Sequence, residues 1–165
     1  SETQMNELLS VLEGLEDTHL IFTMPNADMG GRVLFRVIKN FVAKHSHAKA
    51  FISLGQLRYL SCIQHMSGII GNSSSGLVEV PTFKIGTINV GDRQKGRLKA
   101  DSVIDCQPTK ESIQKAIATL YSEDFQDILP MVKTPYGKSD ATEKIMQVLQ
   151  NIPYPKELKK EFYDL

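Results

Sequence analysis

Three consecutive serines, Ser73 to Ser75, stand between Gly71 and Gly76 in the most chemically suggestive turn of the chain. The turn follows a short apolar run and precedes a helical pattern, which predicts a helix N-terminus. Hydroxyls, free backbone N–H groups and the positive end of the helix dipole together favour binding of a diphosphate. On these residues alone, the alternative that a serine merely caps a helix stays open.

Glu79 lies about one predicted helical turn beyond the serines. A carboxylate there does not favour phosphate, but it can accept hydrogen bonds from a pair of sugar hydroxyls. The serine turn and Glu79 together therefore indicate a nucleotide, although a solvated Glu79 is the simpler alternative.

The loop 91–97 follows another predicted strand and concentrates three cations, Arg93, Lys95 and Arg97. A guanidinium can hold phosphate oxygens bidentately, and Arg93 is the first cation after the strand. We therefore expect Arg93 to supply charge to the anion site, and we expect Lys95 and Arg97 to be exposed loop charges.

Two further loops follow predicted strands. The turn 24–32 contains Asn26, beside Asp28, which could be a helix N-cap. The turn 53–55 contains Ser53 and Leu54, whose backbone groups could recognise the edge of a base, although an ordinary turn fits equally well.

Short apolar strands alternate with longer amphipathic helices along the chain. This order predicts an α/β fold with a doubly wound, Rossmann-like parallel sheet, in which ligands bind beyond the carboxyl ends of the strands. The predicted helix 56–65 places Leu57, Leu60, Cys62 and Ile63 inward. The predicted strands are 19–24, 50–52, 68–71, 87–90 and 103–106, and the predicted helices are 6–15, 33–45, 56–65, 74–83 and 110–121, followed by two or three more.

The composition is that of an ordinary globular domain, with 165 residues, 41% hydrophobic and 23% charged, and predicts one domain, 1–165. Basic and acidic residues both number 19, which argues against nucleic acid or an anionic membrane as partner. The chain has no apolar run of roughly 20 residues, so a cytoplasmic protein is expected.

The cysteines and histidines show no metal-ligand spacing, so we expect no metal and no cofactor. The chain also lacks the glycine-rich patterns of a dinucleotide redox domain and of a P-loop kinase, as well as the GxSxG elbow of hydrolases.

The stretch 71–76 with Glu79, followed by 89–97, resembles hydrolysing UDP-N-acetylglucosamine 2-epimerases of the sialic acid and capsule type. The resemblance extends from about Leu20 to Tyr136 and includes all four loops. It implies that 1–165 is the C-terminal, UDP-binding lobe of a two-domain GT-B enzyme whose N-terminal catalytic lobe is absent. The catalytic acid and base, mostly expected in that lobe, are not identified in this chain.

The resemblance also implies a role for individual residues, with no metal among them. Ser73 and Ser74 would hold the diphosphate, Glu79 the ribose, Arg93 the phosphates, Ser53 with Leu54 the uracil edge, and Asn26 would approach the sugar nucleotide from below.

The implied reaction eliminates UDP from UDP-N-acetylglucosamine and adds water, which yields N-acetylmannosamine. UDP and a UDP-linked N-acetylhexosamine would be the ligands, and the full-length protein would be a homo-oligomer. We expect the chain alone to bind UDP weakly without turnover.

Three alternatives remain. One is an epimerase of a UDP- or GDP-linked diacetamido sugar from the bacillosamine or legionaminate routes, and another is a non-catalytic nucleotide-binding module. A retaining glycosyltransferase of the same fold is disfavoured, because such enzymes often carry two spaced glutamates where this chain offers only Glu79.

Overall fold

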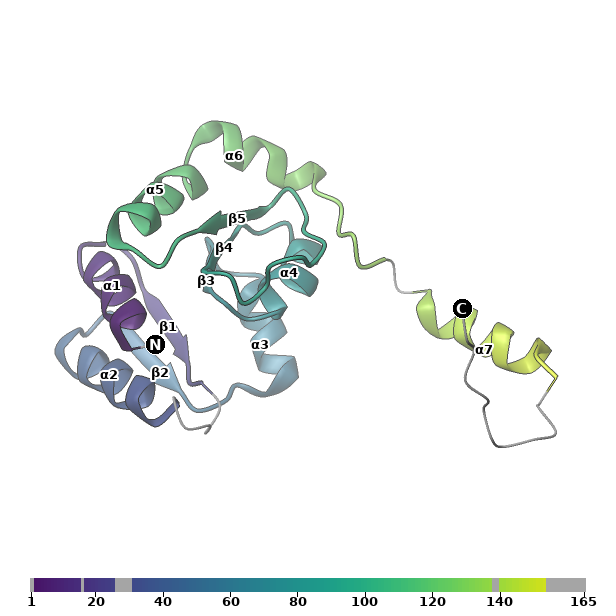
Figure 1. Ribbon diagram of the computed structural model, residues 1–165, viewed down its shortest axis with the longest axis horizontal. Coiled ribbons are helices and arrows are strands. Elements are labelled where there is room, and N and C mark those ends of the chain that lie inside the picture. The colour runs from purple at the N-terminus through teal and green to yellow at the C-terminus, as the bar shows by residue number, and fades with distance from the viewer. Residues whose placement is uncertain (1, 16, 26–30, 138–139, 154–165) are drawn as a thin grey trace, which may run out of the picture. The chain divides into compact units, whose positions relative to one another are not determined.

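The computed structural model describes residues 2–15, 17–25, 31–137 and 140–153 (Figure 1). The chain forms two compact units, Ser1–Pro135 and Tyr136–Leu165. Strands and helices alternate along the first unit, whereas the described part of the second holds one helix, α7. Every expected site residue that the structure describes lies in the first unit.

The order of the elements follows the predicted alternation closely. The strands are β1 Leu20–Thr23, β2 Ala48–Phe51, β3 Ile69–Gly71, β4 Thr87–Val90 and β5 Val103–Cys106. The helices are α1 Glu2–Leu12, α2 Gly31–Lys44, α3 Gly55–Ile63, α4 Ser75–Val78, α5 Lys110–Leu120, α6 Glu123–Ile128 and α7 Ala141–Asn151, with short 3₁₀ segments η1 Val80–Phe83 and η2 Leu129–Met131.

All pairings among the described strands are parallel, which confirms the predicted α/β class. Strand β1 pairs with β2, while β3, β4 and β5 form a second sheet with β4 at its centre. The sequence predicted one continuous sheet. The described strands instead form two sheets, because β3, a strand of only three residues, pairs with β4 and not with β1 or β2.

Amphipathic helices cover the sheets and supply much of the core. The predicted helix 110–121 is confirmed as α5, and Ile113, Ala116 and Leu120 on its apolar face are all buried. Thr109 is the N-cap of this helix, because its hydroxyl accepts a hydrogen bond from the Ser112 backbone N–H.

Helices α1 and α5 are joined by a polar contact as well as by apolar packing. The Glu7 carboxylate accepts a hydrogen bond of 2.9 Å from the backbone N–H of Lys110, the first residue of α5. Leu8, Leu9 and Leu12 of α1 are buried in the same core cluster as the apolar face of α5. A carboxylate at a helix N-terminus also interacts favourably with the helix dipole.

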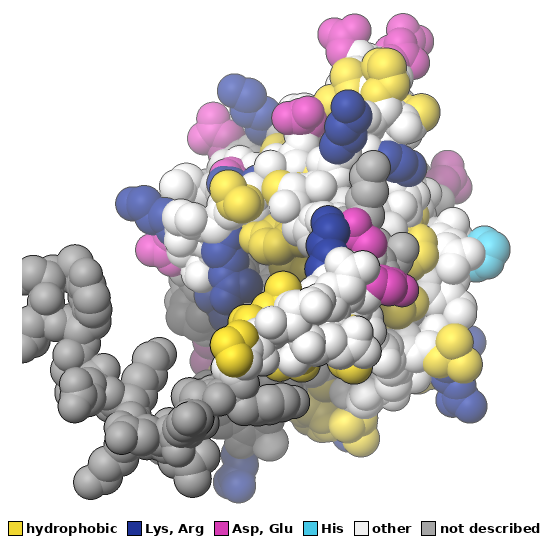
Figure 2. Space-filling view, turned by 90° about the vertical axis from the view of Figure 1, so that its right-hand side faces the viewer, with side chains coloured by type: hydrophobic (Ala, Val, Ile, Leu, Met, Phe, Trp, Pro, Cys, Tyr) yellow, Lys and Arg dark blue, Asp and Glu magenta, His cyan; other side chains and the backbone are white. Residues whose placement is uncertain are grey.

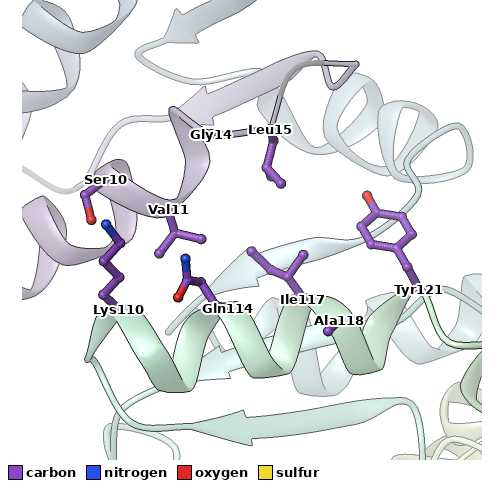
Figure 3. A pocket seen from close by; sticks show the side chains of 9 residues that line it. All are labelled: Ser10, Val11, Gly14, Leu15, Lys110, Gln114, Ile117, Ala118 and Tyr121. Carbon is purple, nitrogen blue, oxygen red and sulfur yellow. The ribbon is translucent and has the colours of Figure 1, made fainter.

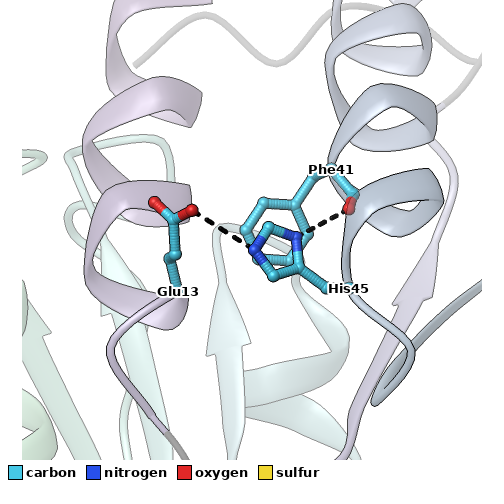
Figure 4. Close-up of polar contacts among 3 residues, drawn as sticks. All are labelled: Glu13, Phe41 and His45. Atoms are coloured by element: carbon cyan, nitrogen blue, oxygen red, sulfur yellow. Dashed lines mark hydrogen bonds and ion pairs between the residues drawn. The ribbon is translucent and has the colours of Figure 1, made fainter.

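His45 links the ends of α1 and α2 (Figure 4). Its ring stacks on Phe41 at a centroid distance of 4.1 Å, and Nδ1 lies 2.8 Å from the Phe41 carbonyl oxygen. Nε2 lies 3.3 Å from Oε1 of Glu13, just beyond α1. This histidine therefore has a packing role between two helices.

Two sequence predictions were wrong in detail. Leu57 is 80% exposed, because it lies six residues before the buried Ile63 and so about 120° away from it around α3. The predicted helix 74–83 is instead the short α4 followed by η1, because Pro81 has no N–H to continue the α-helical ladder.

Helix α7 carries apolar side chains at helical spacing. Ile145, Val148 and Leu149 of α7, and Ile152 directly after it, are each more than half exposed. Among the described residues, no helix is long and apolar enough to cross a bilayer.

The close packing of β4 against α5 and α6 can be tested at Gly86. A Cβ at this position would lie 2.3 Å from Leu120 Cδ1 and 2.8 Å from Phe125 Cε1, so Gly86→Ala should lower the free energy of unfolding by about 1 to 3 kcal/mol. Gly14→Ala is the control, because its Cβ would meet only the Val11 carbonyl oxygen, at 3.5 Å. Urea denaturation of both variants gives the comparison, and equal stabilities would contradict the packing.

Candidate functional site

The serine turn lies between β3 and α4, where two of its three hydroxyls already have partners. Ser73 Oγ accepts a hydrogen bond from the Ser75 backbone N–H, and Ser75 Oγ lies 2.7 Å from the hydroxyl of Tyr59. Ser74 occupies the N-cap position of α4, but its side chain makes no capping hydrogen bond. Ser73 and Ser74 are exposed, and their backbone N–H groups donate to no other described residue. The alternative of simple capping by Ser74 is therefore not what the structure shows.

The base of this turn is held by close contact with β4. Gly76 is buried, and its carbonyl oxygen accepts a hydrogen bond of 2.9 Å from Thr87 Oγ1. A Cβ on Gly76 would lie 2.7 Å from Thr87 Cγ2. The absence of a side chain on Gly76 therefore allows the turn to approach the sheet.

Glu79 lies at the end of α4 and immediately before η1. Its backbone N–H donates to the Ser75 carbonyl oxygen at 2.9 Å, and the residue is half-buried. No hydrogen bond or ion pair joins its carboxylate to another described residue. Glu79 thus remains within the same short segment as Ser73 and Ser74, with an acceptor group available.

Gln94 connects the loop after β4 to the loop after β3. Its side chain is 3% exposed, and Nε2 donates a hydrogen bond of 2.8 Å to the backbone carbonyl of Asn72. Gln94 Oε1 is buried and has no partner among the described residues. The structure therefore places the serine turn and the loop that carries Arg93 side by side.

A second contact fixes the far end of the same loop. The Lys99 ammonium pairs with Asp105 Oδ2, and Asn89 Nδ2 donates a hydrogen bond of 2.8 Å to Asp105 Oδ1. Burial alone would raise the pKa of Asp105, but the hydrogen bonds from Lys99 and Asn89 and the charge of Lys99 outweigh it and lower that pKa. Burial raises the pKa of the neighbouring Cys106 thiol, and the charge of Asp105 adds to this effect.

On both sides of Gln94 the loop turns sharply and presents its cations to solvent. Gly91 and Gly96 adopt φ values of 79° and 82°, a left-handed conformation that glycine tolerates best. Arg93, Lys95 and Arg97 are exposed, and none pairs with another described residue. Figure 2 shows Lys and Arg interspersed with Asp and Glu over one face of the molecule. The loop is therefore a local concentration of positive charge.

Ser53 and Leu54 lie between β2 and α3. Ser53 Oγ accepts a hydrogen bond of 3.1 Å from the Gly55 backbone N–H, and Leu54 is the residue that caps α3. Tyr59, five residues after Leu54, reaches Ser75, and five helical residues rise only about 7 to 8 Å. Helix α3 thus connects the Ser53 turn to the serine turn.

The remaining expected site residue, Asn26, lies outside the described residues. The described residues contain no group of three or more His, Cys, Asp or Glu side chains that could hold a metal ion.

A surface hollow of about 380 Å³ lies between α1 and α5 and contains none of the expected site residues. Figure 3 shows the side chains that line it, with Lys110 and Ser10 toward one end and Tyr121 toward the other. A second hollow of about 340 Å³ includes Met24 and Ile52, which follow β1 and β2. The expected site itself is an open set of loops.

The sequence analysis missed the residues that hold these loops together. Gln94 lies within the stretch 89–97, but only its charged neighbours were singled out there, and Tyr59 belongs to no motif and interrupts no apolar pattern. A weak signal existed for Gln94, since it is the uncharged long side chain among the charged residues 92–97.

The fold and the loops define a Rossmann-like α/β lobe of the GT-B type, with polar loops beyond the strand ends. A solved UDP-GlcNAc 2-epimerase from Methanocaldococcus jannaschii, in complex with UDP-GlcNAc and UDP, superposes with a TM-score of 0.69 at 16% identity over 91% of this chain and 41% of its own. The enzyme from Neisseria meningitidis, bound to UDP-GlcNAc, also gives 0.69, at 13% identity over 92% of this chain and 41% of its own. These likenesses support the fold.

Sequence comparison identifies the family. Residues 1–150 match the family model described as UDP-N-acetylglucosamine 2-epimerase, and the chain belongs to this family. The polysialic acid biosynthesis protein P7 of Escherichia coli is 38% identical over 98% of this chain. A GDP/UDP-N,N'-diacetylbacillosamine 2-epimerase (hydrolyzing) of Campylobacter jejuni is 38% identical over 100% of it. The chain spans only 42% and 43% of the lengths of these two relatives.

The Lys99, Asp105 and Asn89 contact should make stability depend on pH in a defined direction. Folding lowers the pKa of Asp105 from 3.8. The contribution of this carboxylate to the free energy of unfolding is therefore present above pH 3.8 and is lost as pH falls through the folded pKa. Asp105→Asn should therefore lower the Tm by about 1 to 3 °C at pH 7, with a smaller difference at pH 3. Thermal unfolding of Asp101→Asn, an exposed aspartate nearby, is the control and should show no such trend.

The contact between Gly76 and Thr87 allows a test by compensation. Gly76→Ala should destabilise the protein by about 1 to 3 kcal/mol, because the new Cβ overlaps Thr87 Cγ2. Thr87→Ser removes that methyl group and keeps the hydroxyl that donates to the Gly76 carbonyl, so the double variant should recover much of the loss. Equal denaturation midpoints for Gly76→Ala and for the double variant would contradict this contact.

Proposed function

We propose that this chain is the nucleotide-binding part of a hydrolysing UDP-N-acetylglucosamine 2-epimerase. The observation that supports this most directly is the hydrogen bond from Gln94 to the Asn72 carbonyl. It joins a turn with free hydroxyl and N–H donors to a loop with free cations, at the carboxyl ends of two adjacent parallel strands. That edge is where open α/β sheets bind their ligands.

Ser73, Ser74 and Arg93 provide the donors that a diphosphate requires. The two backbone N–H groups of the serines and their hydroxyls are proposed to bind one anionic group, and Arg93 can add a bidentate, charge-assisted contact. Helix α4 has only four residues, so its dipole contributes little and the cation contributes most of the favourable electrostatics.

Glu79 and the turn 53–54 are proposed to bind the nucleoside. The Glu79 carboxylate accepts hydrogen bonds from the two ribose hydroxyls. Backbone groups of Ser53 and Leu54 recognise the edge of uracil, while Asn26 contacts the sugar nucleotide from below. The link through Tyr59 to Ser75 supports a single continuous site for base, ribose and phosphates.

The proposed reaction breaks the bond between the anomeric carbon and the UDP oxygen, loses a proton from the neighbouring carbon and then adds water to yield N-acetylmannosamine. Negative charge grows on UDP as it leaves, so Arg93 and the serine donors stabilise the transition state more than the ground state. The groups that transfer protons are proposed to lie in the larger part of the protein that this chain does not span.

The sugar could instead be a diacetamido hexose carried on UDP or GDP. The Campylobacter jejuni relative, 38% identical, is described as a GDP/UDP-N,N'-diacetylbacillosamine 2-epimerase, and a Legionella pneumophila relative, 30% identical, as a UDP-N,N'-diacetylbacillosamine 2-epimerase. Both candidates share the elimination and hydration chemistry and differ in the sugar.

The proposal also includes one nucleotide-binding domain over 1–165, a cytoplasmic location and a homo-oligomeric full-length protein. The balance of 19 basic and 19 acidic residues supports a protein without a membrane or nucleic-acid partner.

Calorimetric titration of the chain with UDP, GDP and CDP tests the site. UDP should bind in preference to CDP, and Glu79→Ala and Arg93→Ala should each weaken it by about 10- to 100-fold, since each removes hydrogen bonds with a charged partner. The matched control is Lys95→Ala, which removes an exposed cation of the same loop. Because an exposed charge contributes little, this variant should change the affinity for UDP by less than about threefold.

If Lys95→Ala and Arg93→Ala lowered the affinity for UDP equally, the loop would act only as a nonspecific positive surface. Binding of GDP as tight as that of UDP would favour the diacetamido sugar nucleotides. The chain alone should release no N-acetylmannosamine from UDP-N-acetylglucosamine, and measured turnover would place the proton-transferring groups within these 165 residues.

A further inference from the structure

We propose that Gln94 is a positioning residue that joins the loops after β3 and β4 into one clamp for the diphosphate of a nucleotide. This inference rests on the proposed function, because it concerns how the same site is held in shape. No other described side chain bonds the loop 91–97 to the serine turn, so the relative position of the two loops depends on Gln94.

The environment of Gln94 shows why an amide occupies this position. The side chain is 3% exposed, and its Oε1 is buried without a partner. A buried amide that satisfies only one of its groups is unfavourable compared with an apolar side chain of the same length. Packing alone would therefore favour methionine over glutamine at this position. Only the amide of glutamine can donate the hydrogen bond to the Asn72 carbonyl.

Gln94 acts on the site through its neighbours in the chain. It directly follows Arg93, which is exposed, and it bonds to Asn72, which directly precedes Ser73. One hydrogen bond thus fixes the backbone next to the proposed cation and next to the proposed hydroxyl and N–H donors. Strand β4 ends at Val90 and Gln94 is fixed on Asn72, so Arg93 lies between two fixed points of the chain.

This geometry assigns the clamp to the phosphates alone. Ser53 and Leu54 reach the serine turn through α3 and Tyr59, a connection that does not involve Gln94. Loss of the hydrogen bond from Gln94 should therefore lower the affinity for a ligand more, the more phosphates that ligand carries. The contacts with the nucleoside should stay intact.

The test is Gln94→Met, which keeps the length of the side chain and removes both the donor and the unpaired acceptor. Affinities for UDP, UMP and uridine are measured by NMR titration, and the Tm is measured alongside. UDP should bind about five- to tenfold more weakly, which corresponds to the loss of one positioned hydrogen bond, and uridine should bind unchanged.

Two further variants separate positioning from general destabilisation. Gln126→Met removes another glutamine whose Nε2 donates to a backbone carbonyl, that of Leu120 at 2.6 Å, in α6. It should leave UDP affinity unchanged whatever its effect on the Tm. Gln94→Glu keeps the shape but cannot donate to the Asn72 carbonyl when ionised, so it should fail to restore UDP binding.

Hydrogen exchange without nucleotide provides a measurement independent of the proposed function. Gln94→Met should speed amide exchange in 72–76 and in 92–97 together, and Gln126→Met should not. Unchanged exchange in both loops, or equal weakening of UDP and uridine, would overturn the positioning role. Faster exchange in both loops of a protein that binds no UDP even as wild type would uphold the connection between the loops and overturn the nucleotide as its ligand.

Discussion

The parallel register of β3 and β4 is the constraint on which the rest of the site depends. Gly71 lies opposite Asn89, so the chain leaves both strands at the same level and the two following loops emerge as neighbours. Parallel strands require long crossover connections, and here α4 and η1 supply one that keeps Glu79 beside the serine turn. The site thus follows from strand pairing, and Gln94 and Thr87 then fix the loops at close range.

Some charged side chains near the site form ion pairs within the protein, and others are free to bind a ligand. Lys99 is neutralised by Asp105, which holds the end of the loop in place, whereas Arg93 stays in solvent without a described partner. A chain with no net charge can therefore still concentrate positive potential where an anion would bind. The same division explains why overall composition excluded broad classes of partner but said nothing about the local site.

Much of the fold could be predicted from the sequence, because apolar periodicity reports which side of each element is buried. The strand at 87–90 and the inward face of α5 were correct for this reason. Leu57 was wrong because its direction depends on where α3 meets the sheet, which periodicity in a short helix does not determine. Gln94 and Tyr59 were missed because their contacts join segments distant in the chain, and such contacts leave no local pattern. The roles of Ser73, Ser74, Glu79, Arg93, Ser53 and Leu54 remain predictions, as does that of Asn26.

The bond between Glu7 and Lys110 spans 103 positions of the chain, and it has a consequence for how the protein is made. Helix α1 leaves the ribosome before α5, and the α5 surface that covers Leu8, Leu9 and Leu12 is synthesised about a hundred residues later. At translation rates of about 5 to 20 residues per second, that apolar face waits several seconds for its partner. Nascent chains that end before Leu120 would therefore present it to chaperones, and the first unit completes its core only near the end of its own synthesis.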